Sequence, residues 1–178
     1  MIEAGGLAGV AQEPIVVLED GRKISFSFED MLKYHGGNSP GGVAHAFKVL
    51  ERALPLLDAG GGVQRRAIFI ETAFGGPGAR DAFELVTRAV SGERFSLDPS
   101  LARPEHGRTR ERFVFRVRCR DRTTTLMLRE GFVTEEFILL TRKDSRSAGE
   151  ERELKMMKAD MATRVMSARA AAVYDAAS

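Results

Sequence analysis

The chain has 178 residues, which corresponds to one domain with or without an appendage, and its 43% apolar content is enough for a sizeable core. A formal net charge of +2, no Trp and only two Tyr argue against a basic nucleic-acid binder and against an aromatic stacking platform. The single cysteine, Cys119, excludes an internal disulfide and a multi-cysteine zinc site.

The N-terminal residues lack the charged and apolar regions of a signal peptide, and no apolar run approaches the ~20 residues of a membrane span. One cysteine also fits a reducing compartment. We therefore expect a cytoplasmic protein that does not associate with membranes.

Apolar periodicity divides the chain into short strands and amphipathic helices. Asp20-Gly21 is a turn signal between two β-rich runs, and Ser27 with Asp30 forms the capping-box pattern that begins a helix. In chain order we expect strands at 14–18 and 23–26, helices at 28–35 and 43–57, a central strand at 66–71, a helix at 79–90, strands at 94–97, 112–120 and 123–129, a helix or strand at 135–140, and a helix from 148. This order predicts an α+β fold, with a mixed or antiparallel sheet flanked by helices and a long C-terminal helix.

A glycine-rich bend at 34–42 separates the first two predicted helices. Four glycines, a proline, Asn38 and Ser39 make this run unable to continue a helix and too polar for a core. His35 stands near its beginning. The bend is either a simple turn between packed helices or a site in which His35 and backbone N–H groups face a ligand.

A second glycine-rich turn, Gly75-Gly76-Pro77-Gly78, follows the predicted strand at 66–71. Strand, glycine-rich turn and helix form a layout that holds phosphate on backbone N–H groups, and Arg80 would add a positive charge. The chain has neither a Gly-Lys-Ser/Thr ending nor a G-x-G-x-x-G run here, so neither nucleotide fingerprint is present. A tight turn without a ligand is the alternative.

His35 is the candidate catalytic residue, an acid/base whose imidazole Glu71 or Asp81 would orient. His35 is also the candidate metal ligand, with a carboxylate completing a site for zinc or another divalent metal. A triad of Ser39, His35 and Asp81 has no support in the spacing. Ligand or cofactor binding is expected from the two glycine-rich segments, at Asn38, Ser39, Gly41, Gly75, Gly76 and Arg80.

The most regular predicted strand, 112–120, alternates apolar and mostly arginine side chains, with Cys119 on the apolar face. Asp121-Arg122 turns the chain into the strand at 123–129, which predicts a hairpin. The arginine face is either a basic patch for an anionic partner or a solvated face balanced by nearby acids.

Apolar residues recur at steps of three and four in the last predicted helix: Leu154, Met157, Met161, Val165, Ala168 and Ala172. A methionine-rich stripe at this spacing predicts a docking face rather than a ligand site. We therefore divide the chain into a core domain at 1–144 and a C-terminal helical extension at 145–178. The extension would pack across its own domain or against a second copy of the chain, and a homodimer is expected.

The segment Tyr34-His35-Gly36-Gly37-Asn38-Ser39-Pro40-Gly41 resembles the His-Gly-His-x-Cys-Pro-Gly signature of the FmdE family of formylmethanofuran dehydrogenase proteins. Later landmarks follow the order of that family: a strand ending at Glu71, a glycine-rich turn, a helix beginning near Asp81, Val86-Thr87 before Gly92, and a Phe-rich strand after His106-Gly107. The resemblance spans roughly Phe26 to Phe115. It implies a mixed α+β core, often dimeric, with a metal-bearing cleft, in an accessory protein related to molybdenum or tungsten formylmethanofuran dehydrogenase.

Two substitutions distinguish this chain from the signature, because Gly37 replaces its second His and Ser39 replaces its Cys. A hydroxyl is a far poorer zinc ligand than a thiolate, so we expect an altered metal site. Three functions stay open: an accessory protein with a small-molecule or metal-binding cleft, an enzyme that uses His35 on a small anionic substrate, and a non-catalytic dimeric interaction module. For the last, removal of the terminal helix would abolish assembly and leave the core folded.

Overall fold

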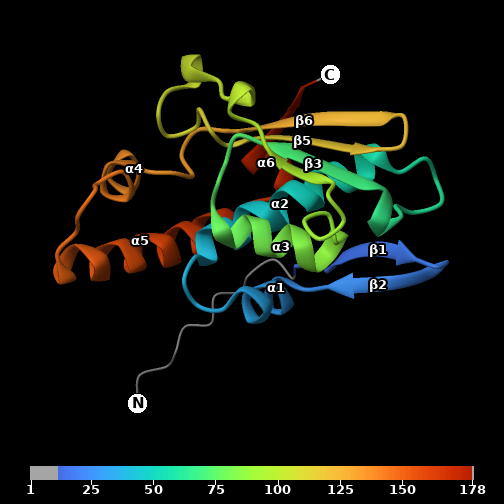
Figure 1. Ribbon diagram of the computed structural model, residues 1–178, viewed down its shortest axis with the longest axis horizontal. Coiled ribbons are helices and arrows are strands. Elements are labelled where there is room, and N and C mark those ends of the chain that lie inside the picture. The colour runs from blue at the N-terminus through green and yellow to red at the C-terminus, as the bar shows by residue number, and fades with distance from the viewer. Residues whose placement is uncertain (1–11, 178) are drawn as a thin grey trace.

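The computed structural model describes residues 12–177, which form two sheets and six α-helices (Figure 1). The predicted α+β fold with a long C-terminal helix is confirmed. The expectation about a signal peptide concerns residues 1–11, which lie outside the described residues. Between residues 12 and 177, no helix is long and apolar enough to cross a membrane.

The bounds of most predicted elements agree with the structure to within a few residues. The strands are β1 (Ile15–Glu19), β2 (Arg22–Phe26), β3 (Ile68–Thr72), β4 (Phe95–Leu97), β5 (Val114–Cys119), β6 (Arg122–Leu128) and β7 (Tyr174–Ala177). The α-helices are α1 (Phe28–His35), α2 (Pro40–Leu57), α3 (Pro77–Thr87), α4 (Glu135–Thr141), α5 (Ala148–Met166) and α6 (Ala170–Val173). Residues 135–141, for which the sequence allows helix or strand, are therefore helical.

The N-terminal hairpin and the helix after it form as predicted. β1 pairs antiparallel with β2, and Asp20 and Gly21 turn with φ angles of 50° and 77°. Positive φ at both turn residues matches the right-handed twist of a two-stranded ribbon. The Ser27 hydroxyl accepts a hydrogen bond from the Asp30 N–H over 3.0 Å, and the Asp30 carboxylate accepts one from the Ser27 N–H over 2.9 Å. This capping box begins α1.

The larger sheet has five strands in the order β4-β3-β5-β6-β7, with β3 and β4 parallel and the other neighbours antiparallel. β3 has a strand on each side, as predicted for a central strand. Its alternation buries Ile68 and Ile70 completely among the core residues. Phe69 and Glu71 therefore point to the opposite face of the sheet.

α2 lies at the centre of the helical layer, where it packs against α3, α5 and the sheet (Figure 1). Phe47 and Leu50 of α2 are fully buried, and Pro55 is accommodated inside its last turn. Both α2 and α3 begin at a proline, Pro40 and Pro77, two or three residues before the predicted starts. The fixed φ of proline suits the first helical position, where its missing N–H has no intrahelical partner to lose.

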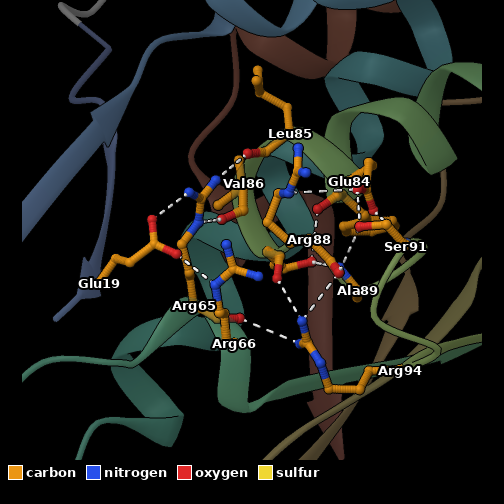
Figure 2. A network of polar contacts seen from close by, with 12 residues as sticks. Glu19, Arg65, Arg66, Glu84, Leu85, Val86, Arg88, Ala89, Ser91 and Arg94 are labelled. Carbon is orange, nitrogen blue, oxygen red and sulfur yellow. Dashed lines mark hydrogen bonds and ion pairs between the residues drawn. The ribbon is translucent and has the colours of Figure 1, made fainter.

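Two arginines hold the C-terminal end of α3 (Figure 2). Arg65 donates to the carbonyl oxygens of Val86 and Leu85 over 2.9 and 2.6 Å. A third nitrogen of Arg65 contacts Glu19 of β1 over 3.0 Å. Arg94 donates to two further carbonyl oxygens at this helix end. Because cations stabilise the carbonyl end of a helix dipole, this network fixes α3 against β1 and the start of β3.

The C-terminal region differs from the prediction of one helix that continues through Ala172. α5 ends at Met166, α6 adds one turn, and β7 pairs antiparallel with β6. Alanine content alone favours a helix here, but residues 174–177 pair instead with the backbone groups at the edge of β6. The apolar stripe of α5 packs within this chain, since Met161 and Val165 are buried in the common core. Tyr174 of β7 is also fully buried, so residues 145–177 share that core.

Candidate functional site

The two glycine-rich segments meet in space, at the point where α2 and α3 begin. A Cβ atom on Gly78 would lie 2.3 Å from the carbonyl oxygen of Ser39, and one on Gly42 would lie 3.1 Å from the backbone nitrogen of Ala79. Only glycine permits so close an approach of two backbones. On the other side of α2, a Cβ on Gly41 would lie 2.9 Å from the sulfur of Met161 in α5.

His35, at the end of α1, links these helix starts through both ring nitrogens. Its Nδ1 lies 2.8 Å from Oδ2 of Asp81 in α3, and its Nε2 accepts a hydrogen bond from the backbone N–H of Ser39 over 3.1 Å. A carboxylate can only accept, so Nδ1 carries the proton and donates. The imidazole side chain is only 5% exposed. Asp81 therefore orients His35, as predicted, and His35 caps the start of α2.

This arrangement leaves His35 without a free ring nitrogen for proton transfer or metal binding. The contact with Ser39 is to its backbone N–H and not to its hydroxyl, so no Ser-His-Asp relay is formed. No group of three or more His, Cys, Asp or Glu side chains within residues 12–177 is placed to hold a metal ion. The donor groups present therefore do not fit a zinc ion at His35.

Within residues 12–177, three other predicted site residues make no hydrogen bond to the His35 ring. Glu71 faces the opposite side of the sheet, where its carboxylate pairs with Arg116 over 2.9 Å. The backbone carbonyl of Asn38 accepts a hydrogen bond from Lys158 of α5 over 3.3 Å. Arg80 is exposed on α3 and is not part of the cleft described next.

A cleft of about 390 Å³ lies beside this junction. Four of the predicted ligand-binding residues line it: Ser39, Gly41, Gly75 and Gly76. Its apolar wall includes the stacked rings of Phe74 and Phe113, with centroids 4.4 Å apart and planes 24° apart. Phe137 and Ile138 of α4 and Met161 of α5 complete that wall. The cleft therefore lies between the helix starts and the α4–α5 pair.

Four cationic side chains also line the cleft: Arg108, Arg112, Arg142 and Lys158. No Asp or Glu lines it among the described residues. Arg108 pairs with Glu135 over 3.5 Å, and Arg142 pairs with Glu111 over 2.7 Å. Cationic groups around an apolar cavity create a positive potential that attracts anions.

His45 lies in the core, where its ring is 4.7 Å from that of Phe113 in the cleft wall. It is fully buried, with Nδ1 2.8 Å from the Tyr174 hydroxyl and Nε2 3.2 Å from the Met161 sulfur. Burial lowers the pKa of His45 to about 3, so the ring is neutral. It is a hydrogen-bonded core residue that joins α2 to α5 and β7.

A larger hollow of about 630 Å³ lies elsewhere, between β1 and the C-terminal half of α2. Its charged lining is mixed, with Lys23 beside Glu13, Glu51 and Asp58. It has no aromatic wall, and its three carboxylates outnumber its one cation, so its lining carries a surplus of negative charge. The cleft at the helix starts has an aromatic wall and a cationic lining, and it contains the residues that the sequence marked.

Sequence reasoning missed the aromatic and cationic walls of the cleft. Strand alternation puts Phe113 and Arg112 on opposite faces, and the composition of residues 142–149 is that of a charged linker. The available signal was the density of arginines at 108–112, just before β5. That signal does not indicate which of these arginines face the glycine-rich turns, because their direction depends on how the loop at 102–113 packs against the starts of α2 and α3.

No protein-family model matches the sequence, and no curated protein matches it. The resemblance to the FmdE family therefore rests on the residues quoted from the chain itself, and membership of that family stays a prediction.

Proposed function

We propose that this chain is a small-molecule-binding accessory protein, of the FmdE type that its glycine-rich signature resembles, and that its ligand occupies the cleft at the starts of α2 and α3. One observation carries the proposal. The cleft combines a stacked aromatic wall with four cationic side chains and no carboxylate in its lining. Ligand sites are typically apolar cavities of 300–1,000 Å³ with a few convergent polar groups, and a volume of about 390 Å³ fits that range.

The binding function is favoured over an acid/base enzyme by the state of His35. Its Nδ1 donates to Asp81 and its Nε2 accepts from Ser39, so neither nitrogen is presented to the cleft. A general base needs a free lone pair within hydrogen-bond reach of its substrate. In this proposal His35 holds the cleft in shape and does not contact the ligand.

The test uses two fluorescent probes, 8-anilinonaphthalene-1-sulfonate and its uncharged relative N-phenyl-1-naphthylamine. Each is titrated against the wild type, Thr141→Trp and Thr163→Trp. Thr141 lines the cleft from α4, whereas Thr163 lies on α5 outside it. Both are exposed helical threonines whose hydroxyls donate to carbonyl oxygens of their own helix, so the two variants are matched.

At least one probe should bind the wild type and Thr163→Trp saturably, with one site per chain. An indole at position 141 occupies the space of the ligand, so the affinity of Thr141→Trp should fall at least about tenfold, or ~1.4 kcal/mol. The proposal is wrong if neither probe binds the wild type, or if Thr141→Trp binds as tightly as Thr163→Trp.

A further inference from the structure

We infer that the ligand of this cleft is an anion with a flat apolar body, and that Arg112 binds its acid group as a carboxylate, sulfonate or phosphate. The inference rests on the proposed binding function and specifies the chemical class of the ligand. It uses the position of Arg112, the pairing of its cationic neighbours and the shape of the apolar wall.

Arg112 directly precedes Phe113, whose buried ring forms the cleft wall. Among residues 12–177, Arg112 has no hydrogen bond, ion pair or ring contact, and it lines the cleft with an exposed side chain. Arg112 lies in the turn before β5, and two arginines of that strand differ from it, because Arg116 pairs with Glu71 and Arg118 stacks on Phe69 with its guanidinium carbon 4.0 Å from the ring centroid. A planar guanidinium can hold a carboxylate, sulfonate or phosphate with two parallel hydrogen bonds.

Two of the neighbouring cations, Arg108 and Lys158, are engaged by exposed residues, whereas Arg142 pairs over 2.7 Å with Glu111, whose side chain is 23% exposed. The side chains of Arg108 and Glu135 are 52% and 60% exposed, and their nitrogen–oxygen distance is 3.5 Å. Within residues 12–177, the Lys158 ammonium donates a hydrogen bond only to the backbone carbonyl of Asn38. Exposed pairs of this kind contribute little to stability, so a ligand anion can replace the carboxylate at low cost. Four cations and two paired carboxylates, Glu111 and Glu135, leave a surplus of positive charge at the cleft.

The apolar wall defines the rest of the ligand. Phe113 is only 2% exposed, so the partly exposed ring of Phe74, which stacks on Phe113, is the aromatic surface on which a planar group can lie. Phe137 and Ile138 contribute from α4 on another side of the cleft. A small inorganic anion would leave this surface in contact with water, and an uncharged apolar compound would leave Arg112 without a partner.

The two naphthalene probes separate these cases, because they share the same aromatic body and differ in one sulfonate. The wild type should bind the sulfonated probe at least about tenfold more tightly than the uncharged one, as expected for a charge-assisted hydrogen bond. In Arg112→Gln this preference for the sulfonated probe should disappear. Arg112→Lys should retain only part of it, because an ammonium group cannot form the two parallel hydrogen bonds of a guanidinium. Arg118→Gln, on the opposite face of the sheet, is the matched control and should retain the full preference.

Salt and inorganic phosphate provide two further arms. Raising the ionic strength should weaken the binding of the sulfonated probe and leave that of the uncharged probe unchanged. Inorganic phosphate at the same concentration as the probe should displace neither. Equal affinity of the wild type for both probes, an unchanged preference in Arg112→Gln, or displacement by phosphate would each overturn the inference. The first two outcomes would overturn only the inference about Arg112. The proposed binding function would stand, because the loss of probe binding in Thr141→Trp tests it separately.

Discussion

The imidazole of His35 and the carboxylate of Asp81 lie 2.8 Å apart, although 46 positions separate them in the chain. This hydrogen bond ties the end of α1 to α3, and the second ring nitrogen of His35 accepts the N–H of Ser39 just before α2. One side chain therefore joins three helices next to the cleft. The Ser39 side chain makes no capping hydrogen bond, and His35 accepts the N–H of this N-cap residue, as the N3 side chain does in a capping box.

Replacing His35 with Ala should lower the free energy of unfolding by about 1–3 kcal/mol, because the Ser39 N–H and the Asp81 carboxylate both lose a partner. Urea denaturation measures the loss. Asp81→Asn keeps an acceptor for the Nδ1 proton and should cost less than His35→Ala. Unchanged stability of His35→Ala would contradict its role as a cap.

Metal analysis tests the zinc site that the family resemblance implies. Because both His35 nitrogens are engaged, untagged protein purified without chelators should contain far less than one divalent metal ion per chain. Elemental analysis of the wild type beside His35→Ala is the measurement. Near-stoichiometric metal that disappears in His35→Ala would show that the ring turns towards a metal, and would replace the capping role with a ligand role.

The crossing of α2 and α3 should tolerate no side chain at Gly78. A methyl group there would lie 2.3 Å from the Ser39 carbonyl oxygen, which belongs to the backbone and cannot move aside cheaply. Gly78→Ala should therefore destabilise the protein by about 1–3 kcal/mol or more. Gly37→Ala is the matched control, because a Cβ on Gly37 meets no atom within 4 Å. Equal melting temperatures for the two variants would contradict the close helix contact.

Mild acid should destabilise the protein through His45. Burial lowers its pKa in the folded protein from 6.5 to about 3, so below pH 6.5 the unfolded chain binds the proton more tightly. The stabilising effect of the neutral ring is complete above pH 6.5 and is lost as the pH falls towards 3. At pH 5 the group alone should lower the free energy of unfolding by about 2 kcal/mol relative to pH 7.

In His45→Gln the loss of unfolding free energy between pH 7 and pH 5 should be smaller than in the wild type by about 2 kcal/mol. In His106→Gln this loss should equal that of the wild type. Urea denaturation of both variants at pH 7 and pH 5 measures the difference. If His45→Gln and the wild type lose equal stability between the two pH values, the ring is not the group that responds.

Removal of Gly149–Ser178 should unfold the core rather than leave it folded. The deletion strips α5 from α2 and removes β7, whose Tyr174 is fully buried and bonded to His45. Circular dichroism and thermal unfolding report the outcome, and a cooperative transition like that of the wild type would be contrary evidence.

Met156→Gln, at a position 68% exposed on α5, should leave stability unchanged. If the predicted homodimer forms through this helix face, Met156→Gln should also weaken it, which gel filtration would detect.

Local chemistry made much of the fold predictable. The first hairpin follows from Asp20-Gly21, and the start of α1 follows from Ser27 and Asp30, because each signal acts on backbone groups a few residues away. The two glycine-rich segments also come together, and Ser39, Gly41, Gly75 and Gly76 line one side of the cleft, while their binding of a ligand stays a prediction.

By itself, the sequence determined the order of the elements, most of their bounds, and the places where side chains had to be small. Only the tertiary structure decided that residues 174–177 become an edge strand, that Glu71 faces Arg116 instead of His35, and that α4 and α5 close a cationic cleft. The physical reason is the range of the interactions. Turns and caps are satisfied within a few residues, whereas strand pairing, ion pairs and cleft walls depend on which distant surfaces pack together.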